Sequence, residues 1–229
     1  MYITQFNNGL LCRLLGHLSA LLFVVGVGFN PSLSFANAQA DQDVSKPVIL
    51  VLGDSLSAAY GMAVEKGWVN LLQAEVSSDY KVVNASISGE TTSGGKQRLP
   101  ALMKQHQPTI LIIELGANDA LRGQNLVFTK NNLKTMIDHC QNAKPICKPV
   151  LLGIRLPTNY GPAYDRLLQK TFESIASTNR LAFHPFFLEE VALDPDLMQW
   201  DGLHPNEQAQ AVILKTVLPV LQSALSSKH

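Results

Sequence analysis

The sequence has no excess of charge of either sign, since 18 Lys and Arg residues balance 18 Asp and Glu residues, and only 16% of its residues are charged. Proteins that bind nucleic acid through its phosphates usually carry an excess of basic residues. The composition therefore argues against nucleic acid, or another strongly charged partner. The chain also lacks internal repeats, low-complexity tracts and linkers, so a single folded domain is expected.

Acidic residues are absent from the first 40 positions. Arg13 precedes an apolar stretch from Leu18 to Phe29, and small residues at Ala-x-Ala spacing follow it. This pattern predicts a secretory signal peptide over residues 1–40, cleaved after Ala38 or Ala40. The apolar stretch is shorter than the about 20 residues of a membrane-spanning helix. We therefore expect a mature domain of residues 41–229, periplasmic or secreted, with no stable membrane insertion after cleavage.

Cysteine is scarce, and only Cys140 and Cys147 lie beyond the predicted signal peptide. Neither Cys nor His residues form a second pair at metal-ligand spacing, which argues against a metal site. An oxidising compartment favours a disulfide between the two, and this bridge would contribute roughly 2 to 3 kcal/mol by closing a short loop. Two buried free thiols remain the alternative, because a sequence does not give the separation of Cα atoms.

Short apolar runs alternate with helical periodicity along the rest of the chain. Such alternation is typical of right-handed βαβ units and a parallel sheet. It predicts an α/β fold, a three-layer α/β/α domain of the flavodoxin-like type with a five-stranded, mainly parallel sheet. Strands are expected at 47–52, 81–85, 109–115, 149–154 and 181–183. Helices are expected around 68–76, 99–106, 133–140 and 164–175 and from about Asn206, with Pro219 kinking or ending the last one.

The stretch Gly-Asp-Ser-Leu-Ser at 53–57 directly follows the first predicted strand. In open α/β sheets, ligands bind at the carboxyl ends of the strands. A serine hydroxyl there is a nucleophile only if a base, usually a histidine oriented by a third group, activates it. Taken alone, Ser55 is better explained as a helix cap after a glycine turn.

The stretch Asp-Gly-Leu-His-Pro at 201–205 offers such a base. At this spacing the Asp201 carboxylate can accept a hydrogen bond from the His204 imidazole and hold its tautomer. Considered singly, Asp201 is the acid of an Asx turn and His204 is a capping residue. His184, before Pro185, is the reserve candidate for the base.

Acyl transfer also needs hydrogen-bond donors aimed at the oxygen that becomes negative. Gly89 can bring its backbone N–H close because it has no Cβ atom, and the Asn118 side chain supplies a second donor. The N–H of Ser55 would be the third. Considered singly, Gly89 is a turn glycine and Asn118 belongs to an Asx turn.

Taken together, these stretches resemble the four blocks of the SGNH (GDSL) hydrolases, in the expected order: 53–57, Gly89, Gly-x-Asn-Asp at 116–119, and 201–205. Within that family the chain is similar to a multifunctional branch of bacterial periplasmic thioesterases and lysophospholipases, with further likeness at 85–89, 98–102, 121–123 and 154–157. The resemblance implies the SGNH hydrolase fold, with Ser55 as nucleophile, His204 as base and Asp201 as its orienting acid. It also implies Ser55, Gly89 and Asn118 as oxyanion donors.

The implied activity is that of a serine esterase hydrolysing acyl esters and thioesters with apolar acyl chains, including acyl-CoA, lysophospholipids and aryl esters. It proceeds through an acyl-enzyme on Ser55, requires no cofactor or metal, and is expected of a monomer whose partner is the small-molecule substrate. In close relatives the segment corresponding to 120–125 is a mobile loop over the acyl chain. The side chains expected to contact substrate are Leu121, Leu156, Pro157, Tyr160 and Phe186.

The chain departs from the family pattern in two respects. Alanine stands at 117 and 120, where the relatives often have glycine, and the Cys140/Cys147 pair is not a feature of the family. Two alternative functions stay open at this point. One is a carbohydrate acetyl-esterase of the same family, and the other is a non-catalytic lipid-binding protein on the same scaffold.

Overall fold

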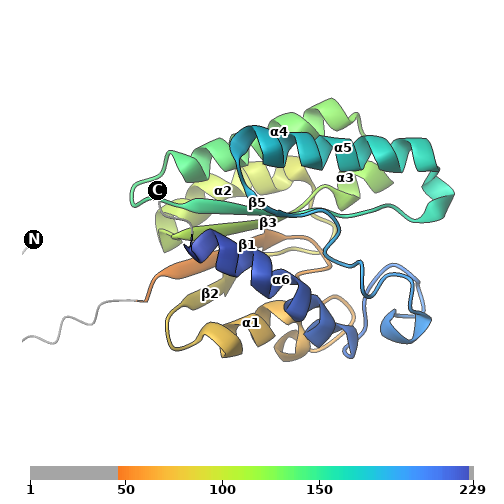
Figure 1. Cartoon of the computed structure of the whole chain (residues 1–229), viewed down its shortest axis with the longest axis horizontal. Coiled ribbons are helices and arrows are strands. Elements are labelled where there is room, and N and C mark those ends of the chain that lie inside the picture. Colours follow the sequence, from red (N-terminus) through yellow and green to blue (C-terminus); the bar gives the residue numbers. More distant parts are fainter. Residues whose placement is uncertain (1–45, 227–229) are drawn as a thin grey trace, which may run out of the picture. The chain divides into compact units, whose positions relative to one another are not determined.

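The computed structural model describes residues 46–226, so the predicted signal peptide lies outside the described residues. Parallel strands and α helices alternate along this part of the chain (Figure 1). The strands are β1 (Val48–Gly53), β2 (Lys81–Asn84), β3 (Ile110–Glu114), β4 (Lys148–Leu152) and β5 (Ala182–His184). The α helices are α1 (Trp68–Val76), α2 (Thr92–His106), α3 (Ala117–Leu121), α4 (Leu126–Gln141), α5 (Pro162–Asn179) and α6 (Ala209–Ser226). Short 3-10 turns are η1 (Val64–Lys66), η2 (Thr158–Tyr160) and η3 (Pro195–Leu197).

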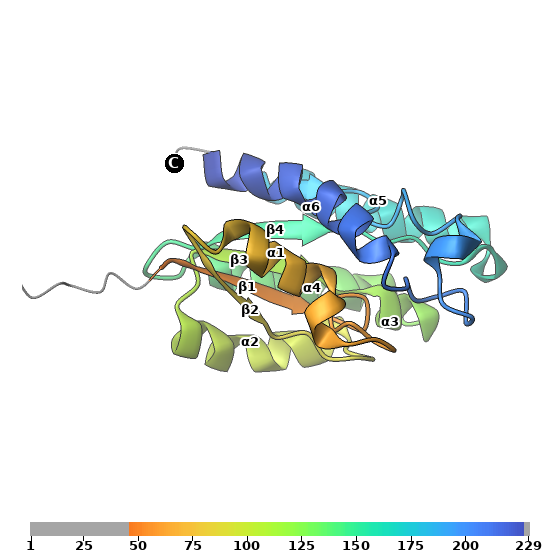
Figure 2. The same ribbon diagram turned by 90° about the horizontal axis from the view of Figure 1, so that it is seen from below.

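The five strands form one sheet in the order β2-β1-β3-β4-β5, and every neighbouring pair is parallel. All carboxyl ends therefore meet at one edge, where Figure 2 shows α3 and the loop before α6. β2, the next strand along the chain, pairs with one side of β1, and β3 then pairs with the other side. Ligands bind in α/β sheets at such a reversal of strand order, which here lies between the carboxyl ends of β1 and β3.

Helices cover both faces of the sheet. α1 packs against α6 on one face, while α2, α4 and α5 pack side by side on the other (Figure 1). Because both faces are covered, the central strands are apolar throughout rather than alternating: Ile49–Leu52 and Ile110–Ile113 are all essentially inaccessible to solvent. The expected α/β fold is confirmed, together with the five-stranded sheet.

The last helix contains Pro219, which the sequence predicts to kink or end it. The proline does not end the helix, because α6 continues to Ser226. A proline inside a helix costs about 3 kcal/mol. Val217 and Leu221 on either side of it are fully buried, and burial of such side chains contributes about 1.5 to 3 kcal/mol each. Packing therefore holds the helix together across the proline.

The same helix is the one described helix long and apolar enough to cross a membrane, with a mean hydropathy of 1.3. Its contacts explain its composition, since it packs against α1, β4 and β5. Ala209 and Ile213 on its inner face are completely buried. We therefore describe α6 as a core helix of this domain.

Two helical segments were incompletely predicted. α2 begins at Thr92, well before the apolar periodicity around 99–106, because its first turn is glycine-rich and is capped by the Thr91 hydroxyl, which accepts from the N–H of Gly94. α3 was expected as a loop, because five residues are too few for a helical period to show in the sequence.

Cys140 at the end of α4 and Cys147 before β4 are joined by a disulfide, with 5.1 Å between their Cα atoms. Both residues are buried. The bridge closes the loop that leads into the amino end of β4, at the edge of the sheet opposite to the carboxyl ends.

We predict that replacing both cysteines (Cys140→Ser with Cys147→Ser) lowers the free energy of unfolding by about 2 kcal/mol, because the unfolded chain regains the entropy of the open loop. The midpoint of thermal unfolding should fall by roughly 4 to 8 °C for a domain of this size. Urea unfolding monitored by circular dichroism measures the change. An unchanged midpoint would contradict the disulfide.

Candidate active site

Ser55, His204 and Asp201 form a hydrogen-bonded chain at the carboxyl edge of the sheet. The Ser55 hydroxyl lies 2.9 Å from Nε2 of His204, although the two residues are 149 positions apart. Nδ1 of the same ring lies 2.7 Å from Oδ2 of Asp201. Because a carboxylate only accepts, Nδ1 carries the proton, which leaves Nε2 free to accept the serine proton. These contacts have the geometry of a nucleophile, a base and an orienting acid.

The loop that carries His204 is held in place by both oxygens of Asp201. Oδ1 accepts from the backbone N–H groups of Leu203 and His204, so the residue also makes the Asx-type turn expected of it. Partial burial raises the pKa of the Asp201 carboxyl, but the hydrogen bonds from the His204 side chain and from the two backbone N–H groups lower it below its ordinary value. Asp201 is thus kept as the charged partner of the imidazole.

Two neighbours that the sequence did not indicate also support the base. The ring of Tyr60 packs 4.3 Å from the His204 ring, centroid to centroid. The N–H of Gln199 donates to the carbonyl of His204, and its side-chain amide donates to the carbonyls of Tyr60 and Pro205. The histidine loop is thereby tied to the loop after β1 that carries the serine. His184, the reserve candidate, lies in β5, where its Nδ1 accepts from the N–H of Phe186.

Gly89 lies in the loop after β2, with a φ of +79° that favours glycine. The N–H of Ile87 donates to the carbonyl of Gly53, which brings this loop to the end of β1. Arg122 fixes it from the other side, since its guanidinium donates to the carbonyl of Gly89 at 3.0 Å. These contacts bring the Gly89 segment to the same edge as Ser55.

Asn118 lies in α3, directly after β3, and not in the Asx turn considered above. Gly116 begins this helix with a φ of +125°, and a Cβ atom there would stand 3.0 Å from the ring of Phe172. The Asn118 side-chain nitrogen donates to Oδ2 of Asp54 at 3.0 Å. An amide nitrogen has two hydrogens, so one N–H of Asn118 is left over after this contact.

Asp54 and Glu114 are buried acids that the sequence analysis missed. Asp54 is 1% exposed and Glu114 is inaccessible. Burial raises the pKa of Asp54 to about 6, although hydrogen bonds from the Leu56 N–H and the Asn118 amide, and the nearby His204, lower it. Burial and then the charge of Asp54 raise the pKa of Glu114 well above its ordinary value. An acid inside the apolar run at 110–115 was the signal that could have revealed the pair.

The side chains expected to contact substrate differ in their exposure to solvent. Leu156 is buried in the core cluster, and Leu121 and Phe186 pack against it. Tyr160 is 39% exposed at the end of η2, and Pro157 is half-buried beside it. Their contribution to substrate binding stays a prediction.

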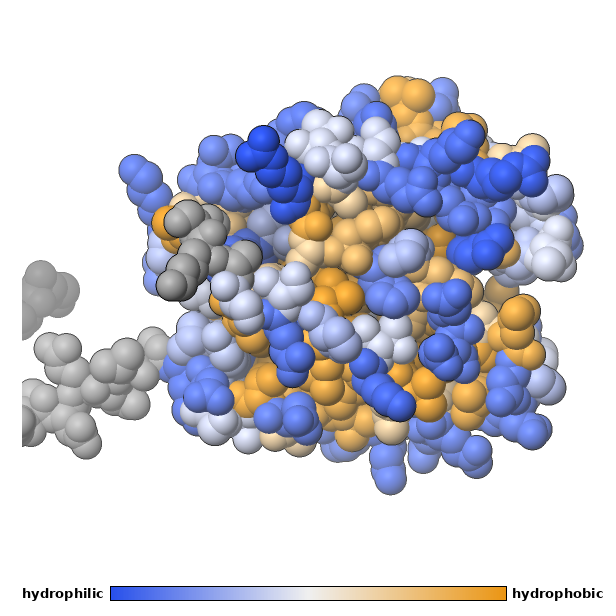
Figure 3. Space-filling view, in the orientation of Figure 1, coloured by the Kyte–Doolittle hydropathy of each residue, from blue (hydrophilic) through white to orange (hydrophobic). Residues whose placement is uncertain are grey.

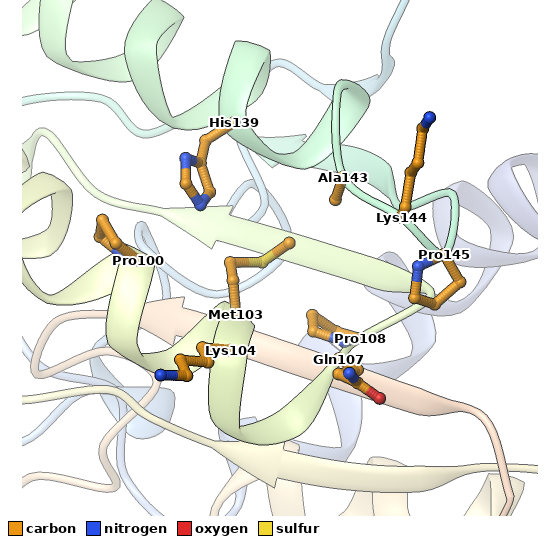
Figure 4. A pocket seen from close by; sticks show the side chains of 9 residues that line it. All are labelled: Pro100, Met103, Lys104, Gln107, Pro108, His139, Ala143, Lys144 and Pro145. Atoms are coloured by element: carbon orange, nitrogen blue, oxygen red, sulfur yellow. The ribbon is translucent and has the colours of Figure 1, made fainter.

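Two cavities, of about 320 and 310 Å³, lie at the amino edge of the sheet, and none of the predicted site residues lines either of them. The first lies between the end of α2 and the segment after α4, with Met103, Pro108 and Pro145 in its wall (Figure 4). Within residues 46–226, no group of three His, Cys, Asp or Glu side chains could hold a metal ion.

Comparison with known proteins identifies the family of this chain. Residues 51–212 match the model of the GDSL-like lipase/acylhydrolase family. Esterase TesA of Pseudomonas aeruginosa is 43% identical over 187 residues, which is 80% of this chain and 92% of TesA. Thioesterase 1/protease 1/lysophospholipase L1 of Escherichia coli is 43% identical over 190 residues, covering 83% of this chain and 88% of that protein.

A solved structure gives the same result. The psychrotrophic esterase EstA from a Pseudoalteromonas species, solved in a form inhibited by monoethylphosphonate, is 40% identical with a TM-score of 0.75. The match covers 80% of this chain and all (100%) of EstA. The chain belongs to the GDSL-like lipase/acylhydrolase family, and the expected SGNH hydrolase fold is confirmed.

The raised pKa of Asp54 predicts a pH-dependent stability. Between its ordinary pKa of 3.8 and about 6, the folded protein binds more protons at this site than the unfolded chain. The stability that Asp54 contributes is therefore full below about pH 4 and is lost as the pH rises through 6. The free energy of unfolding of the unaltered protein, minus that of Asp54→Asn, should fall between pH 4 and 6 and then level off.

Asp201→Asn is the control for this measurement, because the pKa of Asp201 is shifted the other way. The stability that Asp201 contributes is present above its ordinary pKa and is lost as the pH falls through its lower pKa in the folded protein. Urea titrations at a series of pH values provide both differences. A difference for Asp54→Asn that stays constant from pH 4 to 7 would show that its pKa is not raised.

Proposed function

We propose that this protein is a serine hydrolase that cleaves acyl esters and thioesters through an acyl-enzyme on Ser55. The observation that carries this proposal is the hydrogen-bonded chain from the Ser55 hydroxyl through His204 to Asp201, at 2.9 and 2.7 Å. The names of the two relatives, an esterase and a thioesterase/lysophospholipase, support the same reaction class.

In the first half-reaction, the Ser55 oxygen attacks the acyl carbonyl carbon while its proton passes to Nε2 of His204. Asp201 stabilises the imidazolium that forms. The negative carbonyl oxygen of the tetrahedral intermediate accepts hydrogen bonds from the N–H groups of Ser55 and Gly89 and from the Asn118 amide. When the intermediate collapses, Nε2 returns the proton to the leaving oxygen or sulfur, and the acyl group stays on Ser55.

In the second half-reaction, water takes the place of the leaving group. His204 removes a proton from the water as it attacks the acyl carbonyl, and the same donors stabilise the second tetrahedral intermediate. Collapse breaks the bond between the acyl carbon and Ser55, and the proton on Nε2 returns to the serine oxygen. The products are the carboxylic acid and the regenerated enzyme, so the cycle needs neither a metal nor a cofactor.

The rim of the site supports a substrate with an apolar acyl chain. Tyr60, Leu203 and Trp200 are 48%, 43% and 98% exposed, and each contacts or directly adjoins a triad residue. In Figure 3, apolar side chains gather over α1 and α6, whereas apolar and hydrophilic side chains are mixed over the loop between β5 and α6. Such a rim suits acyl thioesters, lysophospholipids and aryl esters better than acetylated sugars, which are polar around the ester.

We further propose that residues 1–40 are removed as a signal peptide and that the mature domain of residues 41–229 acts as a monomer in the periplasm or outside the cell, without stable membrane insertion. The disulfide supports this location, because disulfides persist in oxidising compartments.

Replacing the nucleophile tests the reaction. Ser55→Ala should lower kcat by a factor on the order of 10⁶ and abolish labelling by a fluorophosphonate, because among the described residues the Ser55 hydroxyl is the one hydrogen bonded to His204. Asp201→Asn should lower kcat by roughly 10⁴ through loss of the correct tautomer. Ser223→Ala, an exposed serine on α6, is the control and should keep full activity and labelling. Hydrolysis by Ser55→Ala at the normal rate would refute the proposal.

Substrate class is tested by a rate panel. The value of kcat/KM should rise from acetyl to longer acyl esters and thioesters, by about a factor of 4 for each added methylene that the site buries. Faster hydrolysis of acetylated sugars than of any longer acyl ester would instead assign the protein as a carbohydrate acetyl-esterase. If the protein hydrolysed none of these substrates and did not react with the fluorophosphonate, it would be assigned as a non-catalytic lipid-binding protein.

A further inference from the structure

Asp54 and Glu114 stand beside the nucleophile, but the mechanism above gives neither of them a part. Asp54 directly precedes Ser55, and Glu114 is the last residue of the neighbouring strand β3. Both side chains are withdrawn from water. A buried acid is destabilising unless its hydrogen bonds are satisfied, so their partners indicate why they are there.

Both oxygens of Asp54 are used as acceptors. Oδ1 accepts from the N–H of Leu56 at 3.0 Å, which fixes the turn that presents Ser55. Oδ2 accepts from the side-chain nitrogen of Asn118 at 3.0 Å. Since one amide hydrogen is committed to Asp54, the plane of the amide and the direction of its second N–H are set by this contact.

Glu114 is hydrogen bonded to the backbone of Asp54 and to Ser57 in the turn that follows. Its Oε2 accepts from the N–H of Asp54 at 3.2 Å and from the hydroxyl of Ser57 at 2.7 Å. This oxygen also lies close to the backbone of Gly53, since a Cβ atom on Gly53 would stand only 2.8 Å from it. Burial, and then the negative charge of Asp54, raise the pKa of the Glu114 carboxyl well above its ordinary value. Oε1 of Glu114 is buried and has no hydrogen-bond partner among the described residues, and a buried oxygen without a partner is less costly in a neutral carboxyl than in a charged one.

The two acids therefore differ in protonation state. The charged or titratable groups that act on Asp54 are Glu114 and His204, and Asp54 is the group that acts on Glu114. Two adjacent carboxyl groups do not both ionise in a buried site. The proton stays on Glu114, because burial and the charge of Asp54 raise its pKa, while Asp54 keeps the negative charge that attracts the Asn118 amide.

We propose that Asp54 is a positioning residue of the oxyanion site, which holds the Asn118 amide with its second N–H toward the reacting carbonyl, and that Glu114 is the protonated support that fixes Asp54. This inference rests on the proposed function. The charge matters because an asparagine at 54 has only one acceptor oxygen for two donors. The Asn118 amide could then turn over, which would present an oxygen to the oxyanion and repel it.

The first test compares kinetics of two kinds of variant on one acyl ester. Asp54→Asn should lower kcat by roughly 10²- to 10³-fold, the usual effect of losing one oxyanion donor, with KM changed less than about threefold. Glu114→Ala should lower kcat by roughly tenfold. Glu114→Gln should rescue most of that loss, because a glutamine, like a protonated glutamate, both accepts and donates. A normal kcat in Asp54→Asn, or no rescue by glutamine, would overturn the proposal.

The second test asks whether Asp54 acts through Asn118. Asn118→Ala alone and Asn118→Ala combined with Asp54→Asn should have the same kcat within about threefold, because the residue that Asp54 positions is already missing. A merely structural role, or an action of Asp54 on His204, would instead make the two losses multiply. Multiplied losses would overturn the proposal.

The third test does not depend on variants of Asp54 being folded. In the unaltered protein, the two Nδ2 protons of Asn118, assigned by their loss in Asn118→Ala, should differ strongly in NMR chemical shift, and one should exchange slowly with water. Equivalent, rapidly exchanging protons would overturn the proposal. This readout needs no turnover, so it distinguishes failure of this inference from failure of the proposed function, which would show as inactivity of the unaltered protein.

Discussion

The hydrogen bond between the Ser55 hydroxyl and Nε2 of His204 is the contact on which the site depends, because it joins the first strand to a loop 149 residues later. Everything that fixes its two ends is a property of the fold. Ser55 is placed by the end of the interior strand β1, and His204 by a loop tied to Tyr60 and Asp201. A parallel sheet brings these ends to one edge, so residues distant in sequence can act on the same atom.

A second set of hydrogen bonds lies at the same edge of the sheet. These contacts fix the positions of hydrogen-bond donors and take no part in proton transfer. Asp54 and Glu114 occupy buried positions where apolar side chains would be more stable, and they are satisfied only by one another, by the serine turn and by Asn118. A fold that places two acids under its nucleophile gives up some stability for a fixed arrangement of donors. Such local conflicts between stability and sequence pattern are expected at functional sites.

Much of the fold followed from the sequence, since short apolar runs that alternate with helical periodicity leave few arrangements of βαβ units. The triad was also predictable, because each of its members lies in a motif next to a predicted strand or helix end. What escaped prediction depends on distant contacts: Pro219 inside α6 is tolerated because of packing, α3 is too short to show a period, and the pairing of Glu114 with Asp54 needs the register of β1 against β3. Tyr60 and Arg122 gain their roles only once the loops have met.

The disulfide between Cys140 and Cys147 lies at the end of the sheet where the strands begin, whereas the triad lies where they finish. One contribution to the stability of the fold thus lies far from the residues that carry the chemistry. Changes to the bridge, or to the packing around it, should alter the stability of the protein without altering what it cleaves, so that mutation or engineering could adjust the two properties separately.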